Sequence, residues 1–334
     1  MIFITGGTGL VGAHLLLDYS LKGIKIKALK RINSELDVPK KIFKRHNRFD
    51  LFKNIEWVDG DVLEITSLLE GMSGCDEVIH AAAFVSFAPK EANKMVAINV
   101  QGTENVVNAC LATNIRKLGY VSSVSTLNRE SETELITEEN YWKSNNKNTN
   151  YGISKYLAEQ EVWRGIQEGL SAVIINPSVI LGPGDWNKGS SQLFMKVWKG
   201  LKYYSNGGTA YVDVLDVSKS MVMLMDSPVE NERFIISSEN IKYRTLFDWI
   251  AEGLDKKKAD VAVTPFLKEL AWRLELVKSL ISGKKPLLTR ETANQAMKTT
   301  QYSNQKIKDF GMTFTPVRES VKTYSKWFID EIKS

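Results

Sequence analysis

The chain has 334 residues, of which 43% are hydrophobic and 25% charged, so a large core is available to one elaborated α/β unit or to two packed lobes. Cys75 and Cys110 lack metal-ligand spacing and the three histidines lie far apart, so we expect a cytoplasmic protein with no disulfide framework and no metal. The first strand begins at residue 1, no apolar run reaches membrane-spanning length and the net charge is only +5, so we expect no signal peptide, no membrane span and no nucleic-acid partner.

Residues 2–12 form a short apolar run that breaks into glycines, and helical spacing of leucines follows as far as residue 21. A strand, a tight turn and a helix in this order predict that a dinucleotide pyrophosphate lies on the helix N-terminus, where free N–H groups and the helix dipole favour negative charge. Glycine permits the turn, close approach to phosphate and tight helix–strand packing. A turn that binds nothing is the alternative. The candidate cofactor-binding residues here are Gly6, Thr8, Gly9, Leu10, Val11 and Gly12.

A second predicted strand, Ile24–Leu29, is followed directly by Lys30 and Arg31. In dinucleotide folds this strand end faces the adenosine ribose, where a basic side chain accommodates a 2′-phosphate and an acidic one binds the 2′-hydroxyl. The two bases therefore favour NADP(H), with NAD(H) still open, and two ordinary surface cations are the alternative. Residues 32–54 indicate a loop or short helix, and a solvated surface explains the basic stretch 40–48 better than a phosphate site does.

The chain then alternates strands and helices, which is typical of a doubly wound parallel sheet of the Rossmann type flanked by helices. The fourth predicted strand, Asp76–His80, ends in Ala81, Ala82 and Ala83, small residues that would let a cofactor approach the backbone. His80 itself is better explained as a packed, hydrogen-bonded residue than as a catalytic one. The other elements expected up to residue 177 are strands 55–58, 118–121 and 171–176 and helices 65–72, 95–112 and 151–167, with a long surface connection over 128–150.

After Pro177 the pattern loosens, and no repeat or linker separates the two halves. We expect helices at 190–199, 217–225, 246–254, 265–282, 289–299 and 317–332, an alternating segment at 210–216 and one more core strand at 233–237. A smaller C-terminal substrate lobe should therefore interleave with the cofactor domain. We assign 1–178 plus about 211–238 to the NAD(P)-binding domain, and 179–210 and 239–334 to the substrate lobe.

Ser123, Tyr151 and Lys155 form the strongest chemical constellation of the sequence. Tyr151 and Lys155 lie four residues apart, on one face of one predicted helix. A neighbouring ammonium, together with the charge of an oxidised nicotinamide, would favour phenolate and lower the pKa of a tyrosine from about 10, so Tyr151 would exchange a proton with a carbonyl or alcohol oxygen. Ser123, at the end of the preceding strand, would donate to the same oxygen, with Ser122 and Ser125 as alternates.

These motifs, in this order, resemble the extended branch of the short-chain dehydrogenase/reductase family, the NAD(P)-dependent epimerases, dehydratases and reductases. The resemblance covers essentially the whole chain and is most specific up to about residue 216. It implies that Asn99 props the active-site helices and a water, that Asp61 and Val62 contact adenine, and that Lys155 holds the nicotinamide ribose. It also places Ser122, Pro177 and Ser178 beside the cofactor.

Two segments, 182–186 (Gly-Pro-Gly-Asp-Trp) and 211–217 (Tyr-Val-Asp-Val-Leu-Asp-Val), are similar to the dihydroflavonol-4-reductase-like group of that family. The chain lacks the acidic pair typical of sugar dehydratases and the arginine that binds a nucleotide-sugar diphosphate, and Asn176 replaces a common arginine before proline. The resemblance therefore implies an NADP(H)-dependent reductase of a small ketone or aldehyde, or the reverse alcohol dehydrogenase. A nucleotide-sugar epimerase and a catalytically silent nucleotide sensor are the alternatives, and both a monomer and a homodimer fit.

The predicted helix 265–282 carries an apolar stripe of Phe266, Leu267, Leu270, Leu274, Val277 and Ile281. Charged residues interrupt it too often for a spanning helix. We expect it to pack on the core and to lend Trp272, Leu276 and Leu280 to the mouth of the pocket, which would favour an apolar carbonyl substrate. Core packing alone is the alternative.

Overall fold

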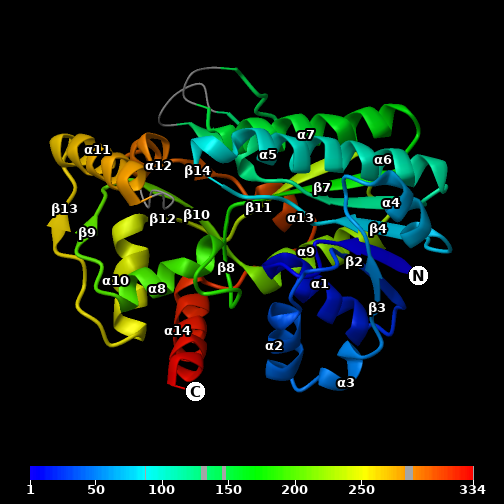
Figure 1. Cartoon of the computed structure of the whole chain (residues 1–334), viewed down its shortest axis with the longest axis horizontal. Coiled ribbons are helices and arrows are strands. Elements are labelled where there is room, and N and C mark those ends of the chain that lie inside the picture. The colour runs from blue at the N-terminus through cyan, green and yellow to red at the C-terminus, as the bar shows by residue number, and fades with distance from the viewer. Residues whose placement is uncertain (87, 129–133, 145–147, 283–288, 334) are drawn as a thin grey trace.

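The computed structural model describes residues 1–86, 88–128, 134–144, 148–282 and 289–333. Its centre is a seven-stranded parallel sheet in the order β11-β7-β5-β4-β1-β2-β3 (Figure 1). These strands are β1 (Ile2–Thr5), β2 (Ile26–Lys30), β3 (Glu56–Asp59), β4 (Glu77–His80), β5 (Lys117–Val121), β7 (Ala172–Pro177) and β11 (Glu232–Ile236). The strand order reverses between β1 and β4, which is where ligands bind in open sheets of this kind. The predicted Rossmann-type fold is confirmed.

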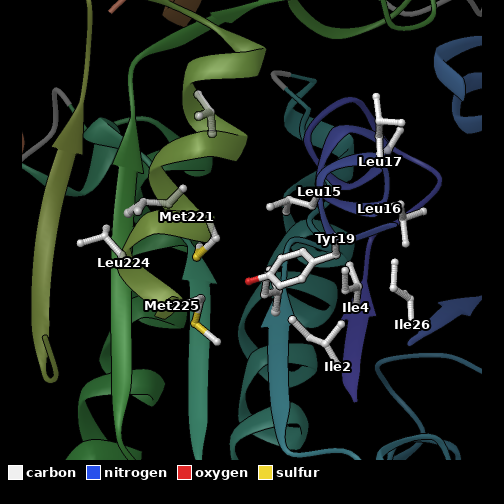
Figure 2. Packing of buried hydrophobic residues seen from close by; sticks show 14 of the residues in the cluster. Ile2, Ile4, Leu15, Leu16, Leu17, Tyr19, Ile26, Met221, Leu224 and Met225 are labelled. Atoms are coloured by element: carbon white, nitrogen blue, oxygen red, sulfur yellow. The ribbon is translucent and has the colours of Figure 1, made fainter. Parts of the chain in front are cut away.

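Helices cover both faces of the sheet, because successive strand residues point to opposite sides. In β1, Ile2 and Ile4 face one core and Phe3 faces the other. The first core lies under α1 (Leu10–Leu21) and α9 (Val214–Asp226), and Figure 2 shows Tyr19 of α1 beside Met221 and Met225 of α9. The second core lies under α4 (Ile65–Met72), α6 (Gly102–Ala112) and α7 (Asn150–Gln167). Because the central strands are buried on both faces, their sequences are continuous apolar runs rather than alternating patterns.

A smaller lobe has its own core and its own three-stranded sheet, in the order β12-β10-β8. Its elements are β8 (Val179–Leu181), α8 (Gln192–Trp198), β10 (Gly208–Asp213), β12 (Glu239–Lys242), α10 (Tyr243–Gly253) and α14 (Val317–Lys333). The alternating segment at 210–216 therefore starts as a strand of this small sheet and continues as α9. Two-stranded pairs β9 (Tyr203–Tyr204) with β13 (Val261–Ala262) and β6 (Leu135–Ile136) with β14 (Gln301–Tyr302) complete the sheets.

Segments of the two lobes alternate along the chain, and residues 211–213, assigned from the sequence to the NAD(P)-binding domain, lie in the smaller sheet. The remaining helices are α2 (Asp37–Arg45), α3 (Phe49–Phe52), α5 (Ala92–Val96), α11 (Pro265–Ser282), α12 (Arg290–Ala296) and α13 (Gln305–Asp309), with single turns at Pro89–Glu91, Val124–Thr126 and Gly189–Ser191. Ile307 of α13 comes late in the chain and yet packs in the first core of the large sheet.

Two predicted segments differ from the structure. The single helix expected over 95–112 is interrupted by a π-helical turn, Ala97–Gln101, which places Asn99 at an irregular point of the backbone. The connection 128–150, expected to lie on the surface, sends Glu138 into the core, where its Oε1 accepts the N–H of Ile235 at 2.8 Å. The Glu138 carboxylate thus binds the edge strand β11, a structural role that the polar composition of this connection does not predict.

The helix α11 forms over the predicted residues, but the prediction that its apolar stripe packs on the core is wrong for Phe266, Leu270 and Leu274, whereas Leu267 is half-buried. Phe266 is 79% exposed, Leu270 44% and Leu274 60%, while Leu276 is also exposed. The opposite face contacts α12, where Lys268 Nζ donates to Asn294 Oδ1 at 2.7 Å. The side chains of Val277, Leu280 and Ile281 lie outside the described residues.

Within the described ranges, none of the helices combines the length and the apolar character that crossing a membrane requires.

Candidate active site

The glycine turn between β1 and α1 has the shape that a phosphate group needs. Gly6 has a φ of +77°, and a Cβ there would lie 2.6 Å from the backbone of Ala81 and Ala82. A Cβ on Gly12 would lie 2.1 Å from the Gly6 oxygen, whereas one on Gly9 would meet only that oxygen, at 3.4 Å. Gly6 and Gly12 are thus fixed by packing, while Gly9 is exposed and leaves open space in front of the turn.

The first turn of α1 is not capped by the protein itself. Gly9, at the N-cap position, has no side chain to accept a bond, and no acidic residue lies in the first turn. Within the described ranges, the N–H groups of Leu10, Val11 and Gly12 have no hydrogen-bond acceptor. Free donors at an uncapped helix N-terminus fit the pyrophosphate of a dinucleotide, which would supply the missing acceptors. Thr8, in the turn, is half-buried.

The strand end after β2 separates the two candidate bases. Lys30 Nζ pairs with Asp59 at the end of β3, so its charge is already neutralised. Arg31 is exposed, and among the described residues no acidic partner is found for it. Asp61 and Val62 follow β3, but Val62 is buried against Gly102, whose added Cβ would lie 2.8 Å from it. Most of the Val62 side chain is therefore unavailable for a contact with adenine.

Ala81, Ala82 and Ala83 continue β4 directly opposite the glycine turn. The N–H of Ala82 donates to Thr5 Oγ1 at 3.3 Å, which ties the end of β4 to the end of β1. Ala83 is exposed. The structure thus brings together the two small-residue segments that the sequence assigned to the cofactor, at the edge where the strand order reverses.

Tyr151 and Lys155 lie in the first turns of α7, whose N-cap Thr149 accepts the N–H of Gly152 at 2.9 Å. Ser123 follows β5, and its hydroxyl acts to lower the pKa of the Tyr151 phenol. The Ser123 oxygen also accepts the N–H of Ser125 at 3.2 Å, which fixes its position in the turn. The predicted serine, tyrosine and lysine therefore converge at the carboxyl end of the sheet.

The ionisation of this pair differs from the sequence-based expectation. Burial raises the pKa of Tyr151, with the Ser123 hydrogen bond acting in the opposite direction, so the protein alone does not lower it. Burial also lowers the pKa of Lys155 to about 7, although Glu159 acts to raise it. The physical reason is that loss of water disfavours both charged forms, and that the Lys155 ammonium points to Tyr120 and Val121.

Asn99 holds the polypeptide around the site through three side-chain hydrogen bonds. Its Oδ1 accepts the N–H of Phe84 at 2.7 Å, and its Nδ2 donates to Phe84 O at 3.0 Å and to Ser154 Oγ at 3.0 Å. Ser154 Oγ donates in turn to Tyr151 O at 2.8 Å. Asn99 therefore links the segment after β4 to the turn of α7 that carries Tyr151, and these hydrogen bonds hold the two segments together.

The sequence-based reasoning missed a buried carboxylate, Glu159, one turn beyond Lys155 on α7. It is 1% exposed. Its Oε2 accepts from Ser122 Oγ (2.5 Å), Thr126 Oγ1 (3.1 Å) and Asn176 Nδ2 (2.8 Å), and its Oε1 from Arg233 Nη1 (3.3 Å) and Trp163 Nε1 (3.4 Å). The spacing of four residues from Lys155 was the signal that could have found it.

These bonds also place the remaining candidates. The Ser122 proton is committed to Glu159, whereas the hydroxyl of Ser125, the other alternate, is buried and has no partner among the described residues. Ser123 therefore stays a prediction as the acting serine. Pro177 and Ser178 are buried at the end of β7, where the N–H of Ser178 donates to Ile236 O at 3.0 Å. Asn176, which replaces the more common arginine, completes the Glu159 cluster and so serves the interior.

The chain is similar to known proteins over most of its length. Residues 2–237 match the model of the NAD dependent epimerase/dehydratase family. The chain is 28% identical to cinnamoyl-CoA reductase 1 of Petunia hybrida, over 96% of this chain and 89% of that protein. It is 27% identical to a putative dihydroflavonol 4-reductase of Synechocystis, over 98% and 94%.

Among solved structures, UDP-glucose 4-epimerase of Thermotoga maritima, determined with UDP-glucose, superposes with a TM-score of 0.78 at 17% identity, over 99% of each chain. A likeness at this identity concerns the fold alone. The family match covers more than two thirds of the chain and includes the glycine turn, Ser123, Tyr151 and Lys155. The chain belongs to the NAD dependent epimerase/dehydratase family, within the extended short-chain dehydrogenases/reductases.

Proposed function

We propose that the protein is an NADP(H)-dependent oxidoreductase that reduces a ketone or aldehyde, or oxidises the corresponding alcohol, with Ser123, Tyr151 and Lys155 in its active site. The observation that carries the proposal is that α7 brings Tyr151 and Lys155 to the end of β5, where Lys155 Nζ donates to Val121 O at 3.0 Å, two residues before Ser123. The similarity to proteins named as cinnamoyl-CoA reductase and dihydroflavonol 4-reductase supports a reductase.

The cofactor, when bound, would supply or accept the hydride. Tyr151 would give its proton to the carbonyl oxygen of the substrate, and burial keeps the phenol in the protonated form that a reduction needs. The Ser123 hydroxyl would hydrogen-bond the same oxygen. Lys155 would hold the nicotinamide ribose and would stabilise the phenolate that forms when the proton leaves.

The remaining candidate contacts belong to the cofactor. The first turn of α1 would receive the pyrophosphate, with Thr8 and Gly9 beside it, and Arg31 would receive the 2′-phosphate of NADP(H). Arg31, which has no acidic partner among the described residues, supports NADP(H) over NAD(H), whereas Lys30 is already paired with Asp59. Asp61, Ala81 and Ala82 would border the adenosine and the riboses.

A cofactor-binding titration tests the role of Arg31. Arg31→Ala should weaken NADPH by roughly 1.5–3 kcal/mol and NADH far less, because only NADPH carries the 2′-phosphate. Lys30→Ala is the matched control, since its ammonium is already paired with Asp59. Equal losses of both cofactors in Arg31→Ala would show that this side chain does not bind the phosphate.

The reaction is tested by incubating the purified protein and NADPH with small and bulky apolar ketones and aldehydes, a cinnamoyl thioester, a dihydroflavonol and UDP-glucose. We expect net oxidation of NADPH with at least one carbonyl compound, lost in Tyr151→Phe. The nucleotide-sugar alternative predicts conversion of UDP-glucose with no net change in the cofactor. A protein that binds NADPH and turns over none of these compounds would instead support a nucleotide sensor.

A further inference from the structure

The ammonium of Lys155 is held from behind by strand β5. Lys155 Nζ donates to the Tyr120 hydroxyl at 2.8 Å and to Val121 O at 3.0 Å. Lys155 is 2% exposed and Tyr120 is fully buried, so water does not compete for either group. Two of the three ammonium protons are thus committed to β5, which leaves one for the active site.

Behind Tyr120 lies a chain of buried polar groups that reaches β1. The His80 ring stacks on the Tyr120 ring with 5.6 Å between centroids. The Thr5 hydroxyl lies 2.7 Å from His80 Nδ1, and the Thr103 hydroxyl lies 3.0 Å from His80 Nε2. The Thr103 side chain also acts on the Tyr120 phenol, where it opposes the rise in pKa that burial causes. This Thr5–His80–Thr103–Tyr120 chain connects three strands and α6 to Lys155.

The direction of each hydrogen bond in the chain is fixed by a single acceptor. Thr103 has one hydroxyl proton and donates it to the carbonyl oxygen of Asn99 at 2.6 Å. Towards His80 and Tyr120, Thr103 can therefore only accept. His80 must then carry its proton on Nε2, so its Nδ1 accepts from Thr5. Burial lowers the pKa of His80 to about 3, with the Lys155 charge acting the same way, so the ring stays neutral.

The same reasoning orients Tyr120. Its oxygen accepts a proton of the Lys155 ammonium, so its own hydroxyl proton points away from Lys155, and Thr103 is the neighbouring side chain that can accept it. We propose that Tyr120, oriented by Thr103 and His80, is a positioning residue that holds the Lys155 ammonium in place and in its charged form for the reaction. The inference rests on the proposed function, in which Lys155 holds the ribose and stabilises the Tyr151 phenolate.

The charge of Lys155 depends on few groups. Those that face it are Glu159 and Tyr151 from its own helix, Tyr120 from β5 and His80 from β4. Burial already lowers the pKa of Lys155 to about 7, so loss of one acceptor would leave the amine largely neutral at physiological pH. The Tyr120 hydroxyl thereby affects the fraction of enzyme molecules in which Lys155 is charged and able to support the reaction.

The test is an NMR titration of the full-length protein with carbon-labelled lysine, in which Lys155 titrates near 7 and is identified by its absence in Lys155→Met. Tyr120→Phe should lower the midpoint by about one to two pH units, the value of one hydrogen bond to a charged group. Tyr19→Phe is the matched control, because Tyr19 is equally buried and, among the described residues, its hydroxyl has no partner. An unchanged midpoint in a folded Tyr120→Phe variant would overturn the proposal.

A second pair of variants keeps the test decisive if Tyr120→Phe does not fold. Thr103→Val should lower the Lys155 midpoint, since the Tyr120 proton loses its acceptor, and Thr103→Ser should restore it. Equal midpoints in the two variants would overturn the proposal. The titration needs no substrate, so its failure is distinct from a failure to find carbonyl turnover. If the carbonyl panel gives no turnover and the midpoint still shifts, the reaction is refuted and the anchoring of Lys155 is retained.

Discussion

The helices α7 and α11 are both 18 residues long, and they distribute their side chains in opposite ways. α7 buries Ser154, Lys155 and Glu159, each no more than 2% exposed, whereas α11 presents Phe266 and Leu274 to solvent. Every buried charge on α7 finds a partner supplied by another element. The apolar groups on α11 find none among the described residues of the core clusters.

The difference shows that burial follows the partners an element meets rather than its own composition. Polar groups enter the interior where opposing strands offer hydrogen bonds of the right geometry, as β5, β7 and β11 do for α7. Apolar groups stay outside where no second surface covers them. A buried charge costs several kcal/mol without its partner, so α7 is the more sensitive helix to mutation.

Tyr151→Phe should have the largest effect of any single change on α7. The phenol is the proposed proton donor, and general acid–base catalysis contributes about 10²–10⁴ in rate, equivalent to roughly 3–5 kcal/mol of barrier. Steady-state kinetics with the best carbonyl substrate measures the loss in kcat, and NADPH titration should show affinity within a few-fold of the parent. A kcat close to that of the parent enzyme would refute the mechanism.

Glu159→Ala should come next, with a loss of roughly 3–5 kcal/mol in the free energy of unfolding, because it leaves Arg233 and Lys155 without their carboxylate. Urea denaturation at neutral pH measures it. The control is Glu161→Ala on the same helix, whose ion pair with Arg164 is partly solvated and should contribute no more than about 1 kcal/mol. Similar losses in both variants would mean that burial does not distinguish the two carboxylates.

The buried Lys155 should make stability depend on pH in a defined direction. Its pKa is about 7 in the folded protein and about 10.5 when unfolded, so the unfolded state binds the proton more tightly. The destabilisation is full below pH 7 and fades as the pH rises to about 10.5. The stability of the parent relative to Lys155→Met should therefore rise by up to about 1.4 kcal/mol per pH unit over that window.

Urea unfolding of the two proteins at about pH 6.5, 8 and 9.5 measures this slope. A stability difference that stays constant across the series would show that the lysine titrates normally in the folded protein.

Phe266→Ser and Leu274→Ser on α11 should have the smallest effects, within about 0.5 kcal/mol of the parent in unfolding free energy, because exposed side chains contribute little. Ile250→Ser on α10 is the matched control, since that apolar side chain is fully buried. A loss above about 1 kcal/mol in either α11 variant would mean that this face is covered in solution.

Much of the fold could be predicted from the sequence, because local patterns determine it. The strand β1 and the helix α1 follow from an apolar run, a glycine turn and helical spacing, and Gly6 occupies the positive-φ position that a side chain would strain. The same holds for the alternation of strands and helices as far as β7. Ser123, Tyr151 and Lys155 could be proposed because their order and spacing resemble a known family.

Only the tertiary structure shows which groups surround Ser123, Tyr151 and Lys155. Tyr120 lies in an apolar strand and Glu159 in a polar helix, so neither stands out until β5, α7 and β11 are packed together. The raised pKa of Tyr151 and the lowered pKa of Lys155 also come from burial, which depends on every neighbouring element. Sequence periodicity specifies which residues share a face, and only the packed partners specify whether that face meets water, an apolar core or a hydrogen-bonding group.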